Sequence, residues 1–303
     1  MTVYPPTSPH SGFAGRAQHW QLRSQCLAIP DRPLLMGIVN VTPDSFSDGG
    51  EFLQTERAVE HALRLFSHGA DLLDIGGEST RPYSDPVSLQ EELDRVVPVV
   101  EQLRAREDVL ISVDTSKAEV AKECLAHGVE IINDVTGFCG DPAMVPLAVE
   151  SQVGVCVMHM QGTPQTMQDV PVYKNVVEDV LDFLRTRRDA LVEAGVLLDR
   201  ICIDPGIGFG KTLQHNLQLL QQIDVFHRLG CPLLVGHSRK GFIKKVLQAE
   251  GGLGNVDLEA GTLGVSLSLA VRGVQILRLH DIEIVRQALV LFGAAGSRWR
   301  PLF

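Results

Sequence analysis

Residues 34–50 read LLMGIVNVTPDSFSDGG and carry the clearest indication of the fold. It begins as an apolar, branched run and changes within a few residues to Asn, Thr, Pro, Asp, Ser and Gly. This change is typical of a buried β-strand that ends in a long polar loop. The loop places an amide, a hydroxyl, two carboxylates and an aromatic ring at the carboxyl end of that strand: Asn40, Thr42, Asp44, Asp48 and Phe46.

Seven further apolar runs of this kind follow along the chain. Together with the first, they cover residues 34–42, 71–77, 109–115, 130–136, 154–160, 201–207, 232–238 and 274–281. Most lack strict polar alternation, which is typical of parallel strands buried on both faces. Amphipathic helical patterns lie between them and after the last, over residues 55–68, 89–103, 117–126, 176–194, 213–229, 258–270 and 282–292.

This alternation predicts an α/β protein, a (β/α)8 TIM barrel in a single domain. The competing architecture is a doubly wound open sheet, whose dinucleotide-binding form carries GxGxxG after the first strand, and none occurs there. Residues 1–18 are interpreted as a flexible N-terminal tail. Residues 19–303 are the expected barrel domain, with residues 20–29 as a short strand or hairpin that closes its bottom.

Composition narrows the class of protein. The 303 residues carry a formal net charge of -10, which argues against a broad nucleic-acid surface because such a surface needs dense Lys and Arg. No apolar run approaches the roughly 20 residues that span a bilayer, and the amino terminus lacks a signal pattern. The six cysteines form no CxxC pair and are expected to be reduced and mostly buried. We therefore expect a cytoplasmic protein.

Polar side chains stand at the carboxyl ends of the expected strands. In a barrel these ends meet at one mouth, where ligands bind. Asp114, which precedes Thr-Ser-Lys, could alone be a helix cap, but capping accounts poorly for eight such ends. One group consists of planar hydrogen-bonding side chains that suit the N–H and amino edge of a flat heterocycle: Asp114, Asn133 and Asp204.

A second group consists of donors and hard oxygen ligands that suit a phosphate with a magnesium ion: Asn40, Thr80, Arg278 and His280. Lys240 suits either group. The segment GIGFGK, residues 206–211, lacks the Walker spacing and is interpreted as a tight turn that supports Asp204. His159 is as readily a packed histidine as a ligand. The absence of a GxSxG motif favours leaving-group stabilisation over covalent catalysis.

Eight motifs carry a family resemblance. They are NVTPDSFSDGG (40–50), DIGGESTRP (74–82), SVDT (112–115), INDVTG (132–137), MHMQGTP (158–164), DPGIGFGK (204–211), SRKGF (238–242) and LRLHD (277–281). In this order they resemble the motif series of the dihydropteroate synthases. The resemblance implies a Mg²⁺-dependent transferase of folate biosynthesis. Its substrates would be 6-hydroxymethyl-7,8-dihydropterin pyrophosphate and p-aminobenzoate, and its products 7,8-dihydropteroate and pyrophosphate. It also implies a sulfonamide target that forms a homodimer.

The same resemblance implies roles for individual residues. The pterin is expected at Asp114, Asn133, Asp204 and Lys240. Mg²⁺ is expected at Asn40, and the pyrophosphate at Thr80, Arg278 and His280. The p-aminobenzoate is expected to border Phe46, Thr80, Pro82, Ser238 and Lys240. The remaining substrate-binding residues are Arg81, Met158 and Phe209, and the residues expected to be catalytic are Asn40, Asp114, Lys240 and Arg278.

Two alternatives stay open beside this reading. A pterin-dependent methyltransferase barrel usually works with a cobalamin module, whose DxHxxG signature the chain lacks. A non-catalytic pterin-binding paralogue is expected to lose Asn40, Lys240 or Arg278, and all three are present. Family members commonly carry Gly after TRP in the second loop, where this chain has Tyr83. Tyr83 in place of Gly concerns the backbone conformation of this loop and its rate of opening. The loop, residues 79–89, is interpreted as a lid together with residues 41–52.

Overall fold

The structure is a computed structural model that describes residues 13–42, 51–251 and 255–296, apart from the side chains of residues 51–53. Its main sheet has eight parallel strands in the order β8-β7-β6-β5-β4-β3-β10-β9. They are β3 (Leu34–Asn40), β4 (Leu72–Gly76), β5 (Leu110–Asp114), β6 (Ile131–Asp134), β7 (Gly154–Met158), β8 (Ile201–Asp204), β9 (Leu234–Val235) and β10 (Ile276–Leu279). Each lies within one of the eight stretches expected from the sequence.

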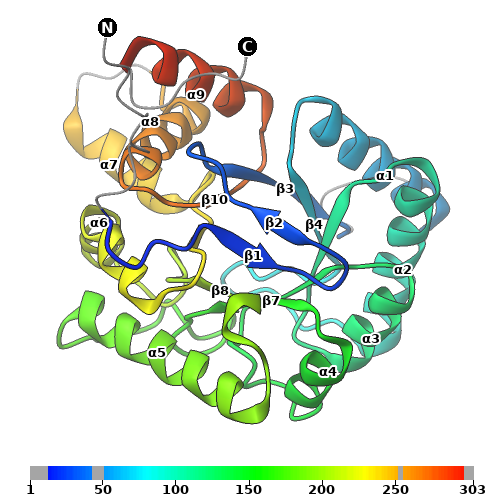
Figure 1. Cartoon of the computed structure of the whole chain (residues 1–303). Helices are drawn as coiled ribbons and strands as arrows, with labels where there is room; N and C mark the ends of the chain where they lie inside the picture. Colours follow the sequence, from blue (N-terminus) through cyan, green and yellow to red (C-terminus); the bar gives the residue numbers. More distant parts are fainter. Residues whose placement is uncertain (1–12, 43–50, 252–254, 297–303) are drawn as a thin grey trace, which may run out of the picture.

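The two ends of the sheet, β8 and β9, meet and close the barrel. Ile203 forms a parallel bridge with Leu233, and the backbone N–H of Ile203 donates to the carbonyl of Pro232 at 2.9 Å. Parallel strands need long crossover connections, and each crossover here contains at least one helix on the outside of the barrel (Figure 1). The predicted (β/α)8 barrel is therefore confirmed.

Nine α-helices are found in the described part of the chain. They are α1 (Glu51–Ser67), α2 (Leu89–Arg106), α3 (Ala118–Ala126), α4 (Met144–Ser151), α5 (Val176–Ala194), α6 (Leu213–Gln221), α7 (Gly241–Glu250), α8 (Leu258–Val271) and α9 (Glu283–Gly296). The sequence pattern does not predict α4 and α7. The helix expected over residues 213–229 is shorter, because the chain tightens into the 3-10 helix Ile223–Leu229 after α6.

Local capping fixes where several helices begin and end. The Ser88 hydroxyl accepts the backbone N–H of Glu91 at 3.3 Å, which starts α2 directly after the second loop. Gly195 ends α5 with a φ of +113°, the left-handed conformation expected for a glycine in this position. The ends of the crossovers are therefore encoded locally.

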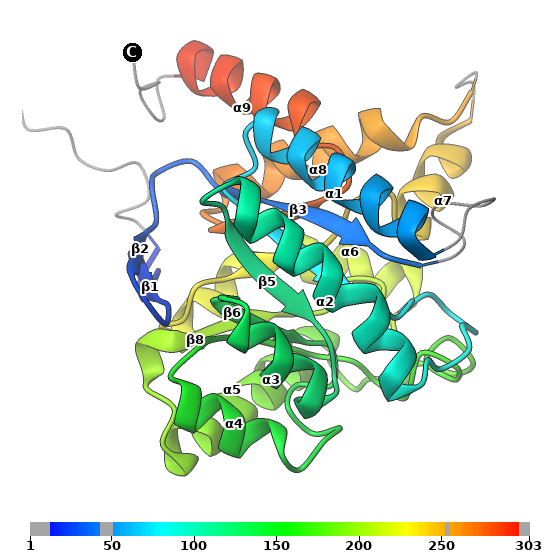
Figure 2. The same ribbon diagram turned by 90° about the vertical axis from the view of Figure 1, so that its right-hand side faces the viewer.

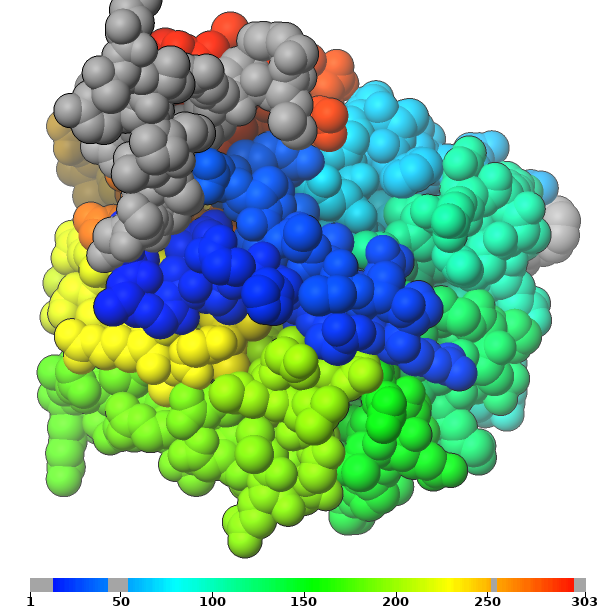
Figure 3. Space-filling model, in the orientation of Figure 1, coloured from blue at the N-terminus to red at the C-terminus, as the bar shows by residue number. Residues whose placement is uncertain are grey.

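A two-stranded antiparallel hairpin, β1 (His19–Gln21) and β2 (Cys26–Ala28), covers one end of the barrel. Figure 3 shows this segment, in blue, across the middle of the face, and Figure 2 shows it at the end from which β3 points away. Trp20 is fully buried there, and its indole N–H donates to the carbonyl of Arg200 at 2.8 Å. The expected hairpin at the bottom of the barrel is confirmed.

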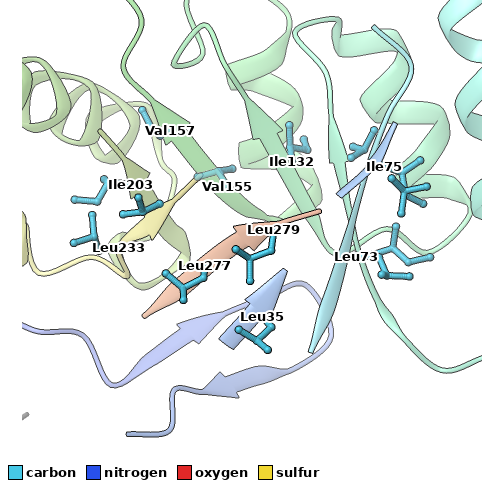
Figure 4. Packing of buried hydrophobic residues seen from close by; sticks show 14 of the residues in the cluster. Leu35, Leu73, Ile75, Ile132, Val155, Val157, Ile203, Leu233, Leu277 and Leu279 are labelled. Atoms are coloured by element: carbon cyan, nitrogen blue, oxygen red, sulfur yellow. The ribbon is translucent and has the colours of Figure 1, made fainter. Parts of the chain in front are cut away.

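The strands bury both faces, as their continuous apolar runs predict. One set of side chains packs against the helices (Figure 4): Leu35, Leu73, Ile75, Ile132, Val155, Val157, Ile203, Leu233, Leu277 and Leu279. The strand residues that alternate with these point into the barrel and fill its bottom together with Trp20: Leu34, Met36, Leu72, Ile131, Cys156, Cys202, Leu234 and Ile276. All six cysteines are free thiols, of which Cys26 and Cys139 are exposed. Among the described residues, no helix is long and apolar enough to cross a membrane.

Candidate active site

The interior of the barrel changes from apolar to polar along each strand. Because side chains alternate with a period of two, residues two positions apart on a strand point to the same side. On β10, Ile276 belongs to the apolar bottom and Arg278 lies one step nearer the mouth; on β8, Cys202 and Asp204 stand in the same relation. The strand period thus delivers the polar residues to the mouth.

A cavity of about 720 Å³ opens at this mouth. Ten of the residues predicted for the site line it: Asn40, Thr80, Arg81, Pro82, Asp114, Phe209, Ser238, Lys240, Arg278 and His280. Three others are buried at the ends of β6, β7 and β8: Asn133, Met158 and Asp204. Phe46 lies outside the described residues. The strand ends are therefore brought together as the sequence predicts.

Arg278 connects two carboxylates across the cavity floor. Its Nε donates to Asp74 Oδ2 at 2.6 Å, and its Nη2 donates to Asp114 Oδ2 at 2.7 Å. The amide of Asn133 donates to the same Asp74 oxygen at 3.0 Å. Asp74 therefore connects the guanidinium of Arg278 with the amide of Asn133, which is one of the residues predicted to bind the heterocycle.

The charged groups of this cluster shift one another's pKa values. Burial raises the pKa of Asp114 above its usual value, although the facing guanidinium of Arg278 opposes the shift. Burial acts to lower the pKa of Arg278, but the charges of Asp74 and Asp114 outweigh it and raise that pKa. A permanently charged guanidinium therefore stands at the centre of the floor.

Lys240 lies at the start of α7 with its Nζ 4.0 Å from the centre of the Phe209 ring. The ammonium donates to the carbonyl of Ile207. Burial lowers the pKa of Lys240 to about 7, against the opposing charge of Asp204. The amine can therefore lose its proton near neutral pH in the free protein.

The segment after β8 is the tight turn that the sequence indicates. The backbone N–H of Gly206 donates to Asp204 Oδ1 at 2.7 Å, which fixes the carboxylate. Gly206 has a φ of +66°, and a Cβ there would lie 1.9 Å from the carbonyl oxygen of His159. A Cβ on Gly208 would lie 2.7 Å from Cδ of Lys240. Only glycine lets the turn approach both neighbours this closely.

His159 is a packed residue on the outer side of this turn. Its Nδ1 lies 2.9 Å from Nζ of the buried Lys211, and its ring meets Phe183 edge to face at 4.8 Å. Burial lowers the pKa of His159 to about 3 and that of Lys211 well below its usual value. Of the two open readings of His159, the structure supports the packed one.

Comparison with known proteins agrees with this geometry. A family model described as "Pterin binding enzyme" matches residues 36–280. A relative from Haemophilus influenzae, dihydropteroate synthase, is 45% identical over 275 residues, 90% of this chain and 98% of its own length. The chain belongs to the dihydropteroate synthase family of pterin-binding enzymes. It is therefore a transferase with dihydropteroate synthase activity, an enzyme of folate biosynthesis.

Solved structures of dihydropteroate synthases share the fold throughout. The enzyme from Yersinia pestis, with a sulfonamide drug complex, is 43% identical with a TM-score of 0.83 and covers 92% of this chain and 99% of its own. The enzyme from Xanthomonas albilineans, in complex with 7,8-dihydropteroate, is 40% identical with a TM-score of 0.81 and covers 92% and 99%. The family resemblance read from the eight motifs is confirmed.

Against this family background, His280 and Ser238 form a second polar group at the mouth. The Ser238 hydroxyl accepts the backbone N–H of His280 at 3.2 Å and lies 3.0 Å from its Nδ1. Burial and the nearby charges of Arg239 and Arg278 lower the pKa of His280 to about 3. The imidazole is therefore neutral in the free protein and presents a hydrogen-bonding group rather than a charge.

The sequence reading of the dihydropteroate synthase motifs missed an ion-pair network behind the second loop. Lys117 Nζ lies 2.5 Å from both Glu78 Oε2 and Glu92 Oε2. Glu92 is fully buried in α2, and Glu78 lines the cavity. The available signal was the position of Glu92 four residues before Val96 and seven before Val99, on the apolar side of the helical pattern, because a carboxylate buried there requires a partner.

Asp74 is a second site residue that the sequence motifs did not single out. It stands two positions after Leu72, which belongs to the apolar bottom, so the period of the strand already predicts that Asp74 points into the barrel. A fully buried carboxylate there needs a cationic partner, which the structure identifies as Arg278.

The donor set at Asn40 fits a magnesium ion carried by substrate. Asn40 ends β3 and lines the cavity with Thr42 and Thr80. The described residues contain no group of three His, Cys, Asp or Glu that could hold a metal. Magnesium commonly uses one or two protein oxygens, completing its shell with water and substrate phosphates. The Asp44 and Asp48 carboxylates of the same loop lie outside the described residues.

Proposed function

We propose that this chain catalyses the Mg²⁺-dependent condensation of 6-hydroxymethyl-7,8-dihydropterin pyrophosphate with p-aminobenzoate. The bond between the pterin methylene carbon and the pyrophosphate oxygen breaks, and a carbon–nitrogen bond to the aniline forms as the nitrogen loses a proton. The products are 7,8-dihydropteroate and pyrophosphate. The observation that supports this most directly is that Arg278, which lines the cavity with Lys240 and His280, pairs with both Asp74 and Asp114.

The pterin is assigned to the floor. Asp114, Asn133 and Asp204 offer oxygens to the N–H and amino edge of the heterocycle, and a carboxylate can accept two parallel hydrogen bonds. The bond from Gly206 to Asp204 leaves the other oxygen, Oδ2, for the ligand. Phe209, under the Lys240 ammonium, and the buried Met158 supply apolar surface for the ring.

The pyrophosphate is assigned to Arg278, His280 and Thr80. Arg278 keeps its charge at any working pH, and it can exchange its contact with Asp114 for a phosphate oxygen while Nε stays on Asp74. Asn40 would hold Mg²⁺ through its side-chain oxygen, and the bound ion would supply positive charge beside the pyrophosphate. Release of pyrophosphate would leave a cation on the pterin methylene, which the Asp114 carboxylate stabilises. The step is therefore SN1-like, and the aniline attacks second.

The p-aminobenzoate is assigned to the rim formed by Ser238, Lys240, Thr80 and Pro82, which face the cavity. Arg81 adds a cation beside them, and Phe46 belongs to this group in the undescribed part of the first loop. The Ser238 hydroxyl and the Lys240 charge suit the carboxylate of the acid. Its amine would then point toward the pterin.

We also propose a cytoplasmic homodimer that associates through the last helices. The outer surface of α9 exposes Ile284, Val290 and Leu291, the last of which is 70% exposed. Neighbouring apolar side chains exposed on one helix suit an interface between subunits. Sedimentation analysis would report the mass, and Leu291→Glu should shift the protein toward the monomer.

The reaction is tested by incubating the protein with both substrates, with and without Mg²⁺, and measuring dihydropteroate and pyrophosphate. We expect equal amounts of both products, and only with the metal. Pterin binding without product would instead indicate a non-catalytic pterin-binding protein. Equal rates after chelation would exclude the role of Mg²⁺.

A further inference from the structure

Tyr83 has an unusual backbone for a large side chain. Its φ is +65°, in the left-handed region that large residues rarely adopt. Only three other non-glycine residues in the described chain share a positive φ: Phe138, Gln152 and Arg239. Tyr83 is also 66% exposed, so burial of its ring does not hold this conformation. Other contacts must compensate for it.

Those contacts come from the loop between β7 and α5. The backbone N–H of Tyr83 donates to the carbonyl of Pro164 at 3.0 Å, and its hydroxyl donates to Asp169 Oδ1 at 3.2 Å. A third bond runs in the opposite direction, from the Gln165 amide to the carbonyl of Ser84 at 3.1 Å. Three hydrogen bonds therefore join two loops whose contacting residues are 81 to 86 positions apart in the chain.

The β7–α5 loop is in turn attached to the pterin side of the cavity. The Gln168 amide donates to the carbonyl of Gly208 at 2.8 Å, and Gly208 packs against the Lys240 side chain. Both Tyr83 and Gln168 line the cavity. A continuous path of contacts thus runs from the second loop, through Asp169 and Gln168, to the turn beneath Lys240.

We propose that Tyr83 is a positioning residue that latches the second loop to the β7–α5 loop and so controls how long p-aminobenzoate stays bound. This inference rests on the proposed assignment of p-aminobenzoate to the rim beside Pro82. With the latch formed, the second loop is held over the rim. When the bond between the Tyr83 hydroxyl and Asp169 breaks, the loop moves away and the aromatic acid exchanges. The pterin, deeper on the floor, depends less on the latch.

The test removes the latch bond from either side. Tyr83→Phe deletes the hydroxyl and keeps the ring, and Asp169→Asn weakens the acceptor. Each should raise the KM for p-aminobenzoate roughly threefold to tenfold and leave the KM for the pterin pyrophosphate within about twofold. The double variant should be no worse than the stronger single variant, because both changes break one bond. Val170→Ala, at an exposed position beside Asp169, is the matched control and should match the wild type.

A further variant separates latching from general stability. Tyr83→Gly removes the hydroxyl and also relieves the left-handed backbone, so it should raise the KM for p-aminobenzoate without lowering Tm. A purely structural role predicts instead a lower Tm and parallel changes in both KM values. Unchanged p-aminobenzoate kinetics in Tyr83→Phe and Asp169→Asn would overturn the latch. Failure of the wild type to turn over would overturn the proposed function, which is a distinct result.

Discussion

The two ends of this barrel are built on opposite principles. At the bottom, the fully buried Trp20 and its hairpin cover an apolar layer, and the indole N–H has a partner in the Arg200 carbonyl. At the mouth, the same strands present carboxylates, an amide and a guanidinium, and a buried oxygen of Asp74 has no protein partner within the described chain. The bottom is therefore mainly an apolar layer, whereas charged and amide side chains meet one another at the mouth.

Backbone strain follows the same division. Tyr83, Phe138 and Arg239, all with positive φ, lie in loops that follow the carboxyl ends of strands, whereas Gln152 caps α4. Strained residues cluster where neighbouring contacts hold them for function. The comparison teaches that mutations at the mouth should change activity before stability, and that mutations at the bottom should do the reverse.

The largest effect is expected from Lys240→Ala. Loss of the ammonium beside Phe209 and Asp204 should lower kcat/KM at least about 1,000-fold, equivalent to about 4 kcal/mol of transition-state stabilisation. Steady-state kinetics measure it, and calorimetry should find an unchanged or higher Tm because a buried charge is removed. Near-normal turnover would contradict the assignment of Lys240.

Trp20→Ala tests the opposite end. Removing a fully buried indole should lower the free energy of unfolding by about 3–5 kcal/mol, while kcat/KM of the folded protein stays within about twofold. Urea unfolding and kinetics report the two quantities. Trp20→Phe, which keeps most of the ring volume, should cost less. A loss of activity as large as the loss of stability would show that the two ends are not separable.

Asp204→Asn should weaken pterin binding by about 2–3 kcal/mol, because an amide mismatches the donors that a carboxylate accepts. Isothermal titration calorimetry measures the Kd. Asp199→Asn, the same change at an exposed position near the bottom, is the control and should leave the Kd unaltered. Equal affinity in both variants would remove Asp204 from the pterin floor.

The smallest expected effect is on pH dependence. The pKa of Lys240 is lowered to about 7 by burial, whereas an unfolded lysine titrates near 10.4. Between these values the unfolded chain binds the extra proton, so stability rises with pH; this contribution is complete above about pH 10.4 and is lost as pH falls through about 7. The unfolding free energy of the wild type should therefore rise by about 1–2 kcal/mol more than that of Lys240→Met between pH 7 and pH 8.5, as measured by urea unfolding at the two pH values. The exposed Lys122, changed to Met, is the control.

Most of the fold could be predicted because it is encoded locally. Eight apolar runs gave eight strands, and Gly195 marked the end of its helix. The eight-residue α4, with Pro146 in its first turn, and the ten-residue α7 escaped prediction. Helices this short are stabilised by packing of side chains such as Phe242 and Ile243 rather than by propensity.

The site divides in the same way. Which side chains point into the barrel follows from the sequence, because the strand period of two is a local property of the chain. Their partners depend on the folded structure, because Arg278 meets Asp74 and Asp114 across sequence separations of 204 and 164 residues. Closure of the barrel creates those contacts and the burial that lowers the pKa of Lys240, and hydrogen bonds with the β7–α5 loop accompany the left-handed backbone at Tyr83. Sequence patterns report local geometry, whereas charge pairing and desolvation depend on distances that exist only after folding.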